Sequence, residues 1–79
     1  MMYVGVDVHK QFCQAAVVEE SGDVLGEYRF ENSEEGIMGL VSRLEAFGRP
    51  AKVAVESTAN LWIQVYDRLE ASGFQVVLS

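Results

Sequence analysis

Cysteines and basic residues are scarce in this chain, and each scarcity excludes a class of protein. Cys13 is the only cysteine among the 79 residues, so no intramolecular disulfide and no zinc-finger spacing can exist. Lysine and arginine number 6 against 12 acidic residues, which gives a net charge of −6. This balance argues against a basic nucleic-acid footprint on this chain alone. It leaves room for a metal-dependent site, because such a site is itself a cluster of carboxylates.

Long apolar runs are also missing. The longest runs are too short to cross a bilayer, and the N-terminus lacks the basic segment and apolar stretch of a signal peptide. We therefore expect a cytoplasmic protein with no membrane partner. The hydrophobic content of 49% is ordinary for a packed globular domain, and the length fits one small domain or a part of one.

The N-terminal stretch sets one carboxylate into an apolar run. Residues 3–8 are rich in valine, as in a buried strand, and Asp7 lies among them. A buried carboxylate is costly unless it is paired, hydrogen-bonded or bound to a metal. We therefore expect Asp7 to need a partner from elsewhere in the chain. The alternative is that the strand ends at Val6 and that Asp7 begins a solvated turn.

Two further strands are predicted before the first helix, over residues 12–18 and 24–30. Gly22 lies in the turn between them, where glycine accepts a positive φ. The later strand alternates, so that one face carries Val24, Gly26, Tyr28 and Phe30. The two strands therefore form a half-exposed antiparallel hairpin. Cys13 falls in the apolar part of this hairpin and is predicted to be a small core residue.

The hydrophobic period then changes to that of a helix. One helical face carries Ile37, Leu40, Val41, Leu44 and Phe47. Asn32 or Ser33 can cap the start of this helix, and Gly48 can end it. Gly36 and Gly39 weaken the helix locally, and we expect them to let it lie close to a sheet.

A fourth strand, a second helix and a fifth strand complete the chain. Residues 51–56 form an apolar strand that ends in Glu56, and Ser57 or Thr58 is expected to cap the next helix. That helix is predicted to end at Gly73 and to bury Leu61, Trp62, Val65, Tyr66 and Leu69. Residues 74–78 form the last strand, and the absence of a closing element after it predicts a truncated domain.

The order β-β-β-α-β-α-β predicts an α/β fold of the ribonuclease H-like type. Its mixed five-stranded sheet would have the order 3-2-1-4-5, with two helices and with strand 4 parallel to strand 1. Adjacent parallel strands end at the same edge, so Asp7 and Glu56 can meet. Because two such carboxylates repel each other, a divalent cation is expected between them. Mg²⁺ retains waters and leaves positions open for a phosphate and a nucleophile.

The sequence resembles a known family in two motifs. Residues 5–10 are Gly-Val-Asp-Val-His-Lys, and residues 53–58 are Val-Ala-Val-Glu-Ser-Thr. Together with the hairpin and helix between them, they resemble the N-terminal RuvC-like domain of the DEDD transposases, a family of insertion-sequence recombinases. The resemblance covers essentially the whole chain.

This resemblance implies a function and a site. Asp7 and Glu56 would be the first two acidic residues of the DEDD set, catalytic and ligands of Mg²⁺ or Mn²⁺. The two later aspartates and the family's serine-containing C-terminal domain would lie beyond Ser79, so residues 1–79 would be inactive alone. The intact protein would cut and rejoin DNA strands with an element-encoded guide RNA as a further partner. Whether it forms a homo-oligomer is left open.

Residues next to the two carboxylates have two interpretations each. His9 and Lys10 could contact a nucleic-acid phosphate or orient a water, or they could be polar residues of a turn. Ser57 and Thr58 fit helix caps better than nucleophiles, because no base is evident nearby.

Two other functions fit parts of the sequence. Actin-like ATPases and sugar kinases also begin with an acidic residue after a strand, followed by a hairpin that holds phosphate. Their loop needs glycine and hydroxyl residues there, whereas this chain has Val8, His9 and Lys10. The third possibility is a non-catalytic module for self-association.

Overall fold

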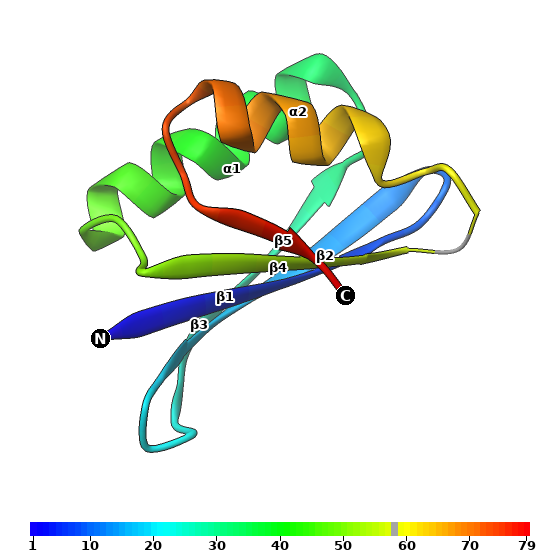
Figure 1. The fold of residues 1–79 in the computed structure, drawn as a ribbon. Helices are drawn as coiled ribbons and strands as arrows, with labels where there is room; N and C mark the ends of the chain where they lie inside the picture. Colours follow the sequence, from blue (N-terminus) through cyan, green and yellow to red (C-terminus); the bar gives the residue numbers. More distant parts are fainter. Residues whose placement is uncertain (58) are drawn as a thin grey trace.

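The fold has two layers, a five-stranded sheet and a pair of helices that cover one of its faces (Figure 1). The computed structural model describes residues 1–57 and 59–79. In chain order the elements are β1 (Met2–Val8), β2 (Phe12–Glu19), β3 (Val24–Glu31), α1 (Glu34–Phe47), β4 (Lys52–Ser57), α2 (Ile63–Ala71) and β5 (Val76–Leu78). The predicted element order is confirmed.

The sheet has the predicted order β3-β2-β1-β4-β5. Strand β1 is antiparallel to β2 and parallel to β4, and β4 is parallel to β5. Each helix therefore serves as the crossover that returns the chain to a parallel strand, as short right-handed connections require. The central strand β1 has neighbours on both sides, which places its residues in the middle of the molecule.

The core lies between the sheet and the helices. In β1, Val4, Val6 and Val8 alternate toward the helices and are almost fully buried. The helices contribute the buried residues Ile37, Leu40, Val41, Leu44, Val65 and Leu69. Cys13 is buried with them, as predicted. No polar or charged residue in the described ranges is buried, so this core is held by apolar packing.

Helix α1 begins and ends as its sequence predicts. Ser33 caps it, and its hydroxyl oxygen accepts a hydrogen bond from the Gly36 amide at 3.1 Å. Gly48 ends it in the left-handed conformation, with a φ of 101°. A Cβ built on Gly36 would stand 2.0 Å from the Glu31 carbonyl oxygen. This confirms that Gly36 allows a close approach between the helix and the end of β3.

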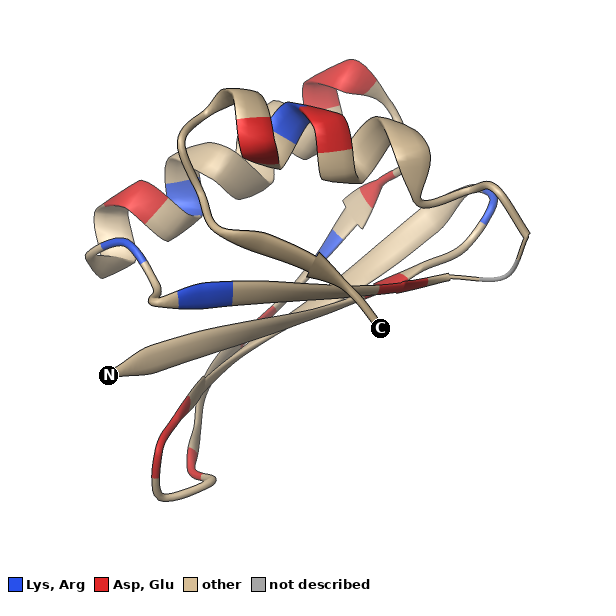
Figure 2. Cartoon of the chain, in the orientation of Figure 1, with Lys and Arg blue, Asp and Glu red and all other residues tan. Residues whose placement is uncertain are grey.

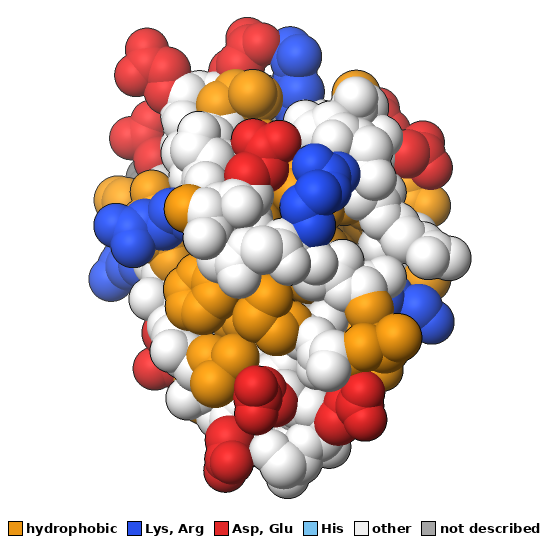
Figure 3. Space-filling view, turned by 90° about the vertical axis from the view of Figure 1, so that its left-hand side faces the viewer, with side chains coloured by type: hydrophobic (Ala, Val, Ile, Leu, Met, Phe, Trp, Pro, Cys, Tyr) orange, Lys and Arg blue, Asp and Glu red, His pale blue; other side chains and the backbone are white. Residues whose placement is uncertain are grey.

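Several apolar residues expected in the core are not fully buried. Leu61, Trp62 and Tyr66 are only partly buried against it. Phe47 is 45% exposed at the end of α1, where its ring covers Gly26 on the edge strand β3. Val24 is 59% exposed because it begins β3 next to the hairpin turn. Apolar side chains gather, between charged ones, on the side of the molecule seen in Figure 3.

Helix α2 begins later than predicted. Its first residue is Ile63, and Trp62 occupies the N-cap position without a side-chain hydrogen bond. The prediction that Ser57 caps α2 is wrong, because Ser57 continues the β4 ladder and pairs with Val8. Thr58, the other predicted cap, lies outside the described residues. None of the helices in the described ranges is long and apolar enough to span a membrane.

Candidate active site

Asp7 and Glu56 lie side by side on the face of the sheet that the helices leave uncovered. The parallel ladder between β1 and β4 pairs these two residues directly. Both are exposed, between buried or half-buried neighbours on their strands. Adjacent strands are about 4.8 Å apart, so the two carboxylates start from neighbouring backbone positions. The register therefore places Asp7 and Glu56 at neighbouring positions near the carboxyl ends of two adjacent parallel strands, as the strand order predicts.

The expected burial of Asp7 is wrong. Its side chain is 61% exposed, because the alternation that points Val6 and Val8 into the core points Asp7 the other way. The alternative that β1 ends at Val6 is also wrong, since the strand continues to Val8. Asp7 is therefore a strand residue whose carboxylate remains in water, and its ionised form needs no partner to be tolerated there.

We call this surface the open face. It is made of strand residues that alternate along the chain with the core-facing ones and point away from the helices. They are Gly5, Asp7, Gln14, Ala16, Arg29, Ala54 and Glu56. A shallow hollow on it is lined by Asp7, Glu56 and Gln14 together with small residues and Ser79. The small residues leave space above the sheet; a Cβ on Gly5 would meet nothing within 4 Å. The hollow can therefore admit a ligand beside the carboxylates.

His9 contacts the first carboxylate. Its Nε2 atom lies 3.0 Å from Oδ2 of Asp7, and its side chain is 62% exposed. The turn that carries it is fixed by Asn32, whose side-chain amide donates to the His9 carbonyl oxygen at 2.9 Å. The Asn32 backbone amide also donates to the Gln11 carbonyl oxygen at 2.8 Å. Since Ser33 caps α1, Asn32 instead holds the β1–β2 turn against the end of β3.

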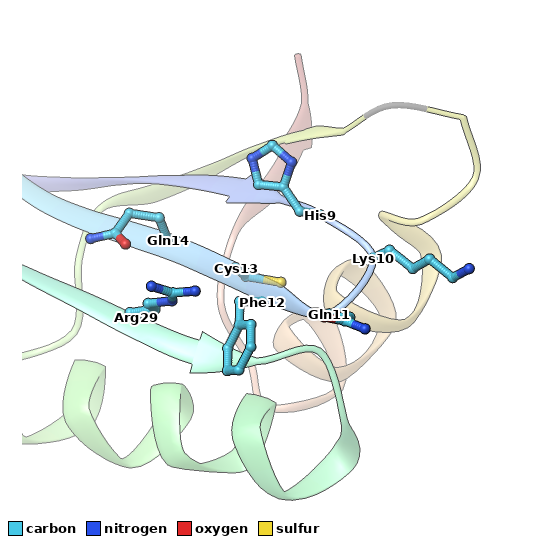
Figure 4. Close-up of a pocket in the computed structure, with 7 residues that line it drawn as sticks. All are labelled: His9, Lys10, Gln11, Phe12, Cys13, Gln14 and Arg29. Carbon is cyan, nitrogen blue, oxygen red and sulfur yellow. The ribbon is translucent and has the colours of Figure 1, made fainter.

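A second hollow adjoins the first. It is lined by the turn and the start of β2, together with one residue of β3: His9, Lys10, Gln11, Phe12, Cys13, Gln14 and Arg29 (Figure 4). Burial raises the pKa of the Cys13 thiol, with the Asp7 charge adding to the rise and a backbone hydrogen bond from His9 opposing it. Phe12, Gln14 and Arg29 were not predicted as site residues. The alternation of β2, with Cys13 and Ala15 inward, is the signal that could have placed Phe12 and Gln14 on the open face.

The donor set suits a hydrated divalent cation. No group of three or more histidine, cysteine, aspartate or glutamate side chains in the described residues could hold a metal ion by itself. Two exposed carboxylates side by side are nevertheless what Mg²⁺ uses, because it keeps several waters and takes one or two carboxylates from the protein. The residues present therefore fit a partial magnesium site.

The chain matches a family model and several solved structures. The model of the DEDD transposases of IS110, described as "Transposase", matches residues 4–79. No curated protein matches the chain by sequence. RuvC of Thermus thermophilus is 21% identical, with a TM-score of 0.69 over 100% of this chain and 63% of its own. Ribonuclease H1 of Halobacterium salinarum is 9% identical, with a TM-score of 0.60 over 99% of this chain and 84% of its own.

The same fold also occurs in a kinase. A ROK family glucokinase from Streptomyces griseus is 17% identical, with a TM-score of 0.68 over 100% of this chain and 33% of its own. At such low identities these likenesses show the fold alone, which is ribonuclease H-like. The chain thus spans about two thirds of the RuvC chain and one third of the glucokinase chain.

Proposed function

The chain belongs to the IS110 family of DEDD transposases, and on that basis we propose that Asp7 and Glu56 supply two ligands of a Mg²⁺-dependent site for DNA strand cleavage and transfer. The observation that carries this proposal is the register that pairs Asp7 with Glu56 on the open face. Mn²⁺ would suit the same oxygen ligands. When bound, the cation would polarise a phosphoryl oxygen and activate a bound nucleophile.

The two residues after Asp7 have roles in this proposal. His9, through its 3.0 Å contact with Asp7, orients the carboxylate toward the hollow that it shares with Glu56. Lys10 is exposed in the same turn, where its ammonium group can contact a phosphate of the substrate. Neither side chain lines the hollow that holds the two carboxylates.

The proposal includes parts of the protein outside residues 1–79. The two remaining acidic residues of the DEDD set and the serine-containing domain lie outside residues 1–79, and this chain is the N-terminal part of the RuvC-like domain. The share of the RuvC chain that it spans, 63%, supports this division. DNA is the substrate, an element-encoded RNA guides it, and self-association of the protein would bring two DNA ends together.

A phosphate-binding role of the kinase type is less well supported. Such a role needs backbone amides and hydroxyls turned toward a nucleotide just after the first acidic residue. Here Val8 is fully buried against the helices, and His9 is engaged with the carboxylate itself. The fold likeness to the glucokinase does not change this, because it concerns the backbone and not the residues of the loop.

A titration with Mn²⁺ tests the proposed metal ligands. Bound Mn²⁺ broadens the NMR signals of nearby amides, and we expect selective loss of the signals around Asp7 and Glu56. Asp7→Asn and Glu56→Gln should each abolish this selective broadening. The matched control is Glu27→Gln, which removes an exposed carboxylate from β3 at the far edge of the sheet and should leave the pattern unchanged. Equal broadening of the amide signals near every acidic residue would contradict the proposal.

A further inference from the structure

A phosphodiester strand must reach two carboxylates on a chain whose net charge is −6. Acidic positions occur along both helices and at the tip of the β2–β3 hairpin (Figure 2). Of the six cationic side chains, four are paired or lie elsewhere: Arg49 and Arg68 form ion pairs, Arg43 belongs to α1, and Lys52 begins β4 at the end opposite Glu56. Lys10 and Arg29 are the two that remain near the carboxylates.

Arg29 lies in one row with the carboxylates. The register pairs Arg29 with Gln14 and Gln14 with Asp7. Asp7 in turn pairs with Glu56. All four side chains are exposed on the open face, so a straight line across four strands runs from the arginine to the second carboxylate. With strands about 4.8 Å apart, Arg29 and Asp7 are roughly 10 Å apart at their backbones.

The guanidinium group of Arg29 is held in place and keeps its donors available. Its central carbon lies 4.4 Å from the centre of the Phe12 ring, and Phe12 is 43% exposed. Glu27 and Glu31 flank Arg29 on β3, but no ion pair joins Arg29 to any carboxylate of the described residues. A guanidinium stacked on a ring presents its N–H edges to solvent in the fork that binds phosphate oxygens.

The surface between this arginine and the carboxylates is continuous. Gln14 lines both hollows of the open face, the one with Asp7 and Glu56 and the one with Arg29 and Phe12. Figure 4 shows Gln14 and Arg29 on neighbouring strands beside the His9 turn. A ligand that extends from the carboxylates along this row would pass Gln14 before it reached Arg29.

We propose that Arg29, stacked on Phe12, binds a phosphate of the DNA strand whose neighbouring phosphate is held at Asp7 and Glu56. Gln14 lies between them, and its side-chain amide donates a hydrogen bond to the same backbone. The inference rests on the proposed function and adds a binding subsite to it. The contact is to the phosphodiester and not to a base, so Arg29 would bind a DNA strand of any base sequence in the same way.

Binding of fluorescein-labelled oligothymidylate to the 79-residue chain, followed by anisotropy and by NMR titration at several salt concentrations, tests this subsite. We expect Arg29→Gln to weaken binding by roughly three- to fivefold, as for an exposed charge pair. The slope of log affinity against log salt should fall by about 0.7, the loss of one contact to a single strand. Phe12→Leu, which retains the charge but removes the stacking surface, should weaken binding less.

Arg43→Gln is the matched control, because Arg43 also stacks on an aromatic ring at 4.3 Å but belongs to α1 on the covered side of the sheet. It removes the same net charge and should leave binding unchanged. Equal losses for the two variants, or no loss for Arg29→Gln, would overturn the inference. So would Arg29-dependent binding of oligouridylate without binding of oligothymidylate. Since Mn²⁺ binding is measured separately, a failure at Asp7 and Glu56 remains distinguishable from a failure at Arg29.

Discussion

At the scale of single residues, side-chain alternation along a strand decides the chemistry of the site. Asp7 is flanked by Val6 and Val8, both buried, and yet its own side chain is 61% exposed. The apolar composition of this stretch predicted the strand correctly but gave the carboxylate the wrong environment. A run of buried valines shows only that one face is covered, since every second residue points away from that face.

Exposure makes the effect of Asp7 on stability small. We expect Asp7→Asn to change the free energy of unfolding by no more than about 1 kcal/mol, because the contact with His9 is an exposed one. Thermal melts of the wild type and the variant at neutral pH, without divalent cations, measure this. The same variant should lose the selective Mn²⁺ broadening. A large fall in melting temperature would instead show that Asp7 holds the β1–β2 turn.

Cys13 gives a prediction for alkaline pH. Burial raises the pKa of its thiol in the folded chain, so the folded state retains the proton after the unfolded state has lost it. The stabilisation is therefore fully present below the unfolded pKa of the thiol and is lost as pH rises toward the folded pKa. We expect the free energy of unfolding to fall more steeply with alkaline pH in the wild type than in Cys13→Ala.

Urea unfolding of both proteins across neutral and alkaline pH checks this difference. The two proteins differ at this one residue, so subtracting the two curves isolates the thiol. Parallel curves would mean that Cys13 ionises equally well in the folded and unfolded chains, which its burial against the core argues against.

At the scale of elements, the order and most boundaries could be predicted from the sequence because local signals agree with the fold. Ser33 and Gly48 delimit α1 as expected. The start of α2 could not be predicted in this way, since the ladder to β1 extends β4 through Ser57. The row from Arg29 to Glu56 could not be predicted from the sequence either. It depends on the register between four strands, and composition does not show register.

Helix α1 offers a matched pair of glycine substitutions. Gly36→Ala would place a methyl group 2.0 Å from the Glu31 carbonyl oxygen, so the helix must shift away from β3. We expect a loss of roughly 1–3 kcal/mol in the free energy of unfolding, as for other overpacked positions. Chemical denaturation measures the loss.

Gly39→Ala is the comparison for that variant. Its Cβ would lie 3.1 Å from the Tyr28 hydroxyl, which is the far end of a side chain and can move. Alanine is also favoured over glycine within a helix by about 1 kcal/mol. Gly39→Ala should therefore be close to neutral or mildly stabilising. If both variants destabilise equally, the close approach at Gly36 is not what requires glycine there.

At the scale of the whole molecule, the two faces of the sheet have separate tasks. The covered face carries the apolar packing against α1 and α2, and the open face carries the carboxylates, Gln14 and Arg29. Substitutions on the open face can therefore change binding without removing core contacts. The backbone fold therefore does not fix the chemistry of the open face, which depends on the residues placed there.

The chain as a unit is expected to lack nuclease activity of its own. Two carboxylates and water hold Mg²⁺ weakly, and no three histidine, cysteine, aspartate or glutamate side chains of the described residues form a group that could hold a metal ion. We expect the purified 79-residue chain not to nick supercoiled plasmid DNA in Mg²⁺ or Mn²⁺, although it binds single strands through Arg29. A preparation of Asp7→Asn, treated identically, controls for contaminating nucleases. Metal-dependent nicking by the wild type that this variant lacks would show that Asp7 and Glu56 suffice for cleavage.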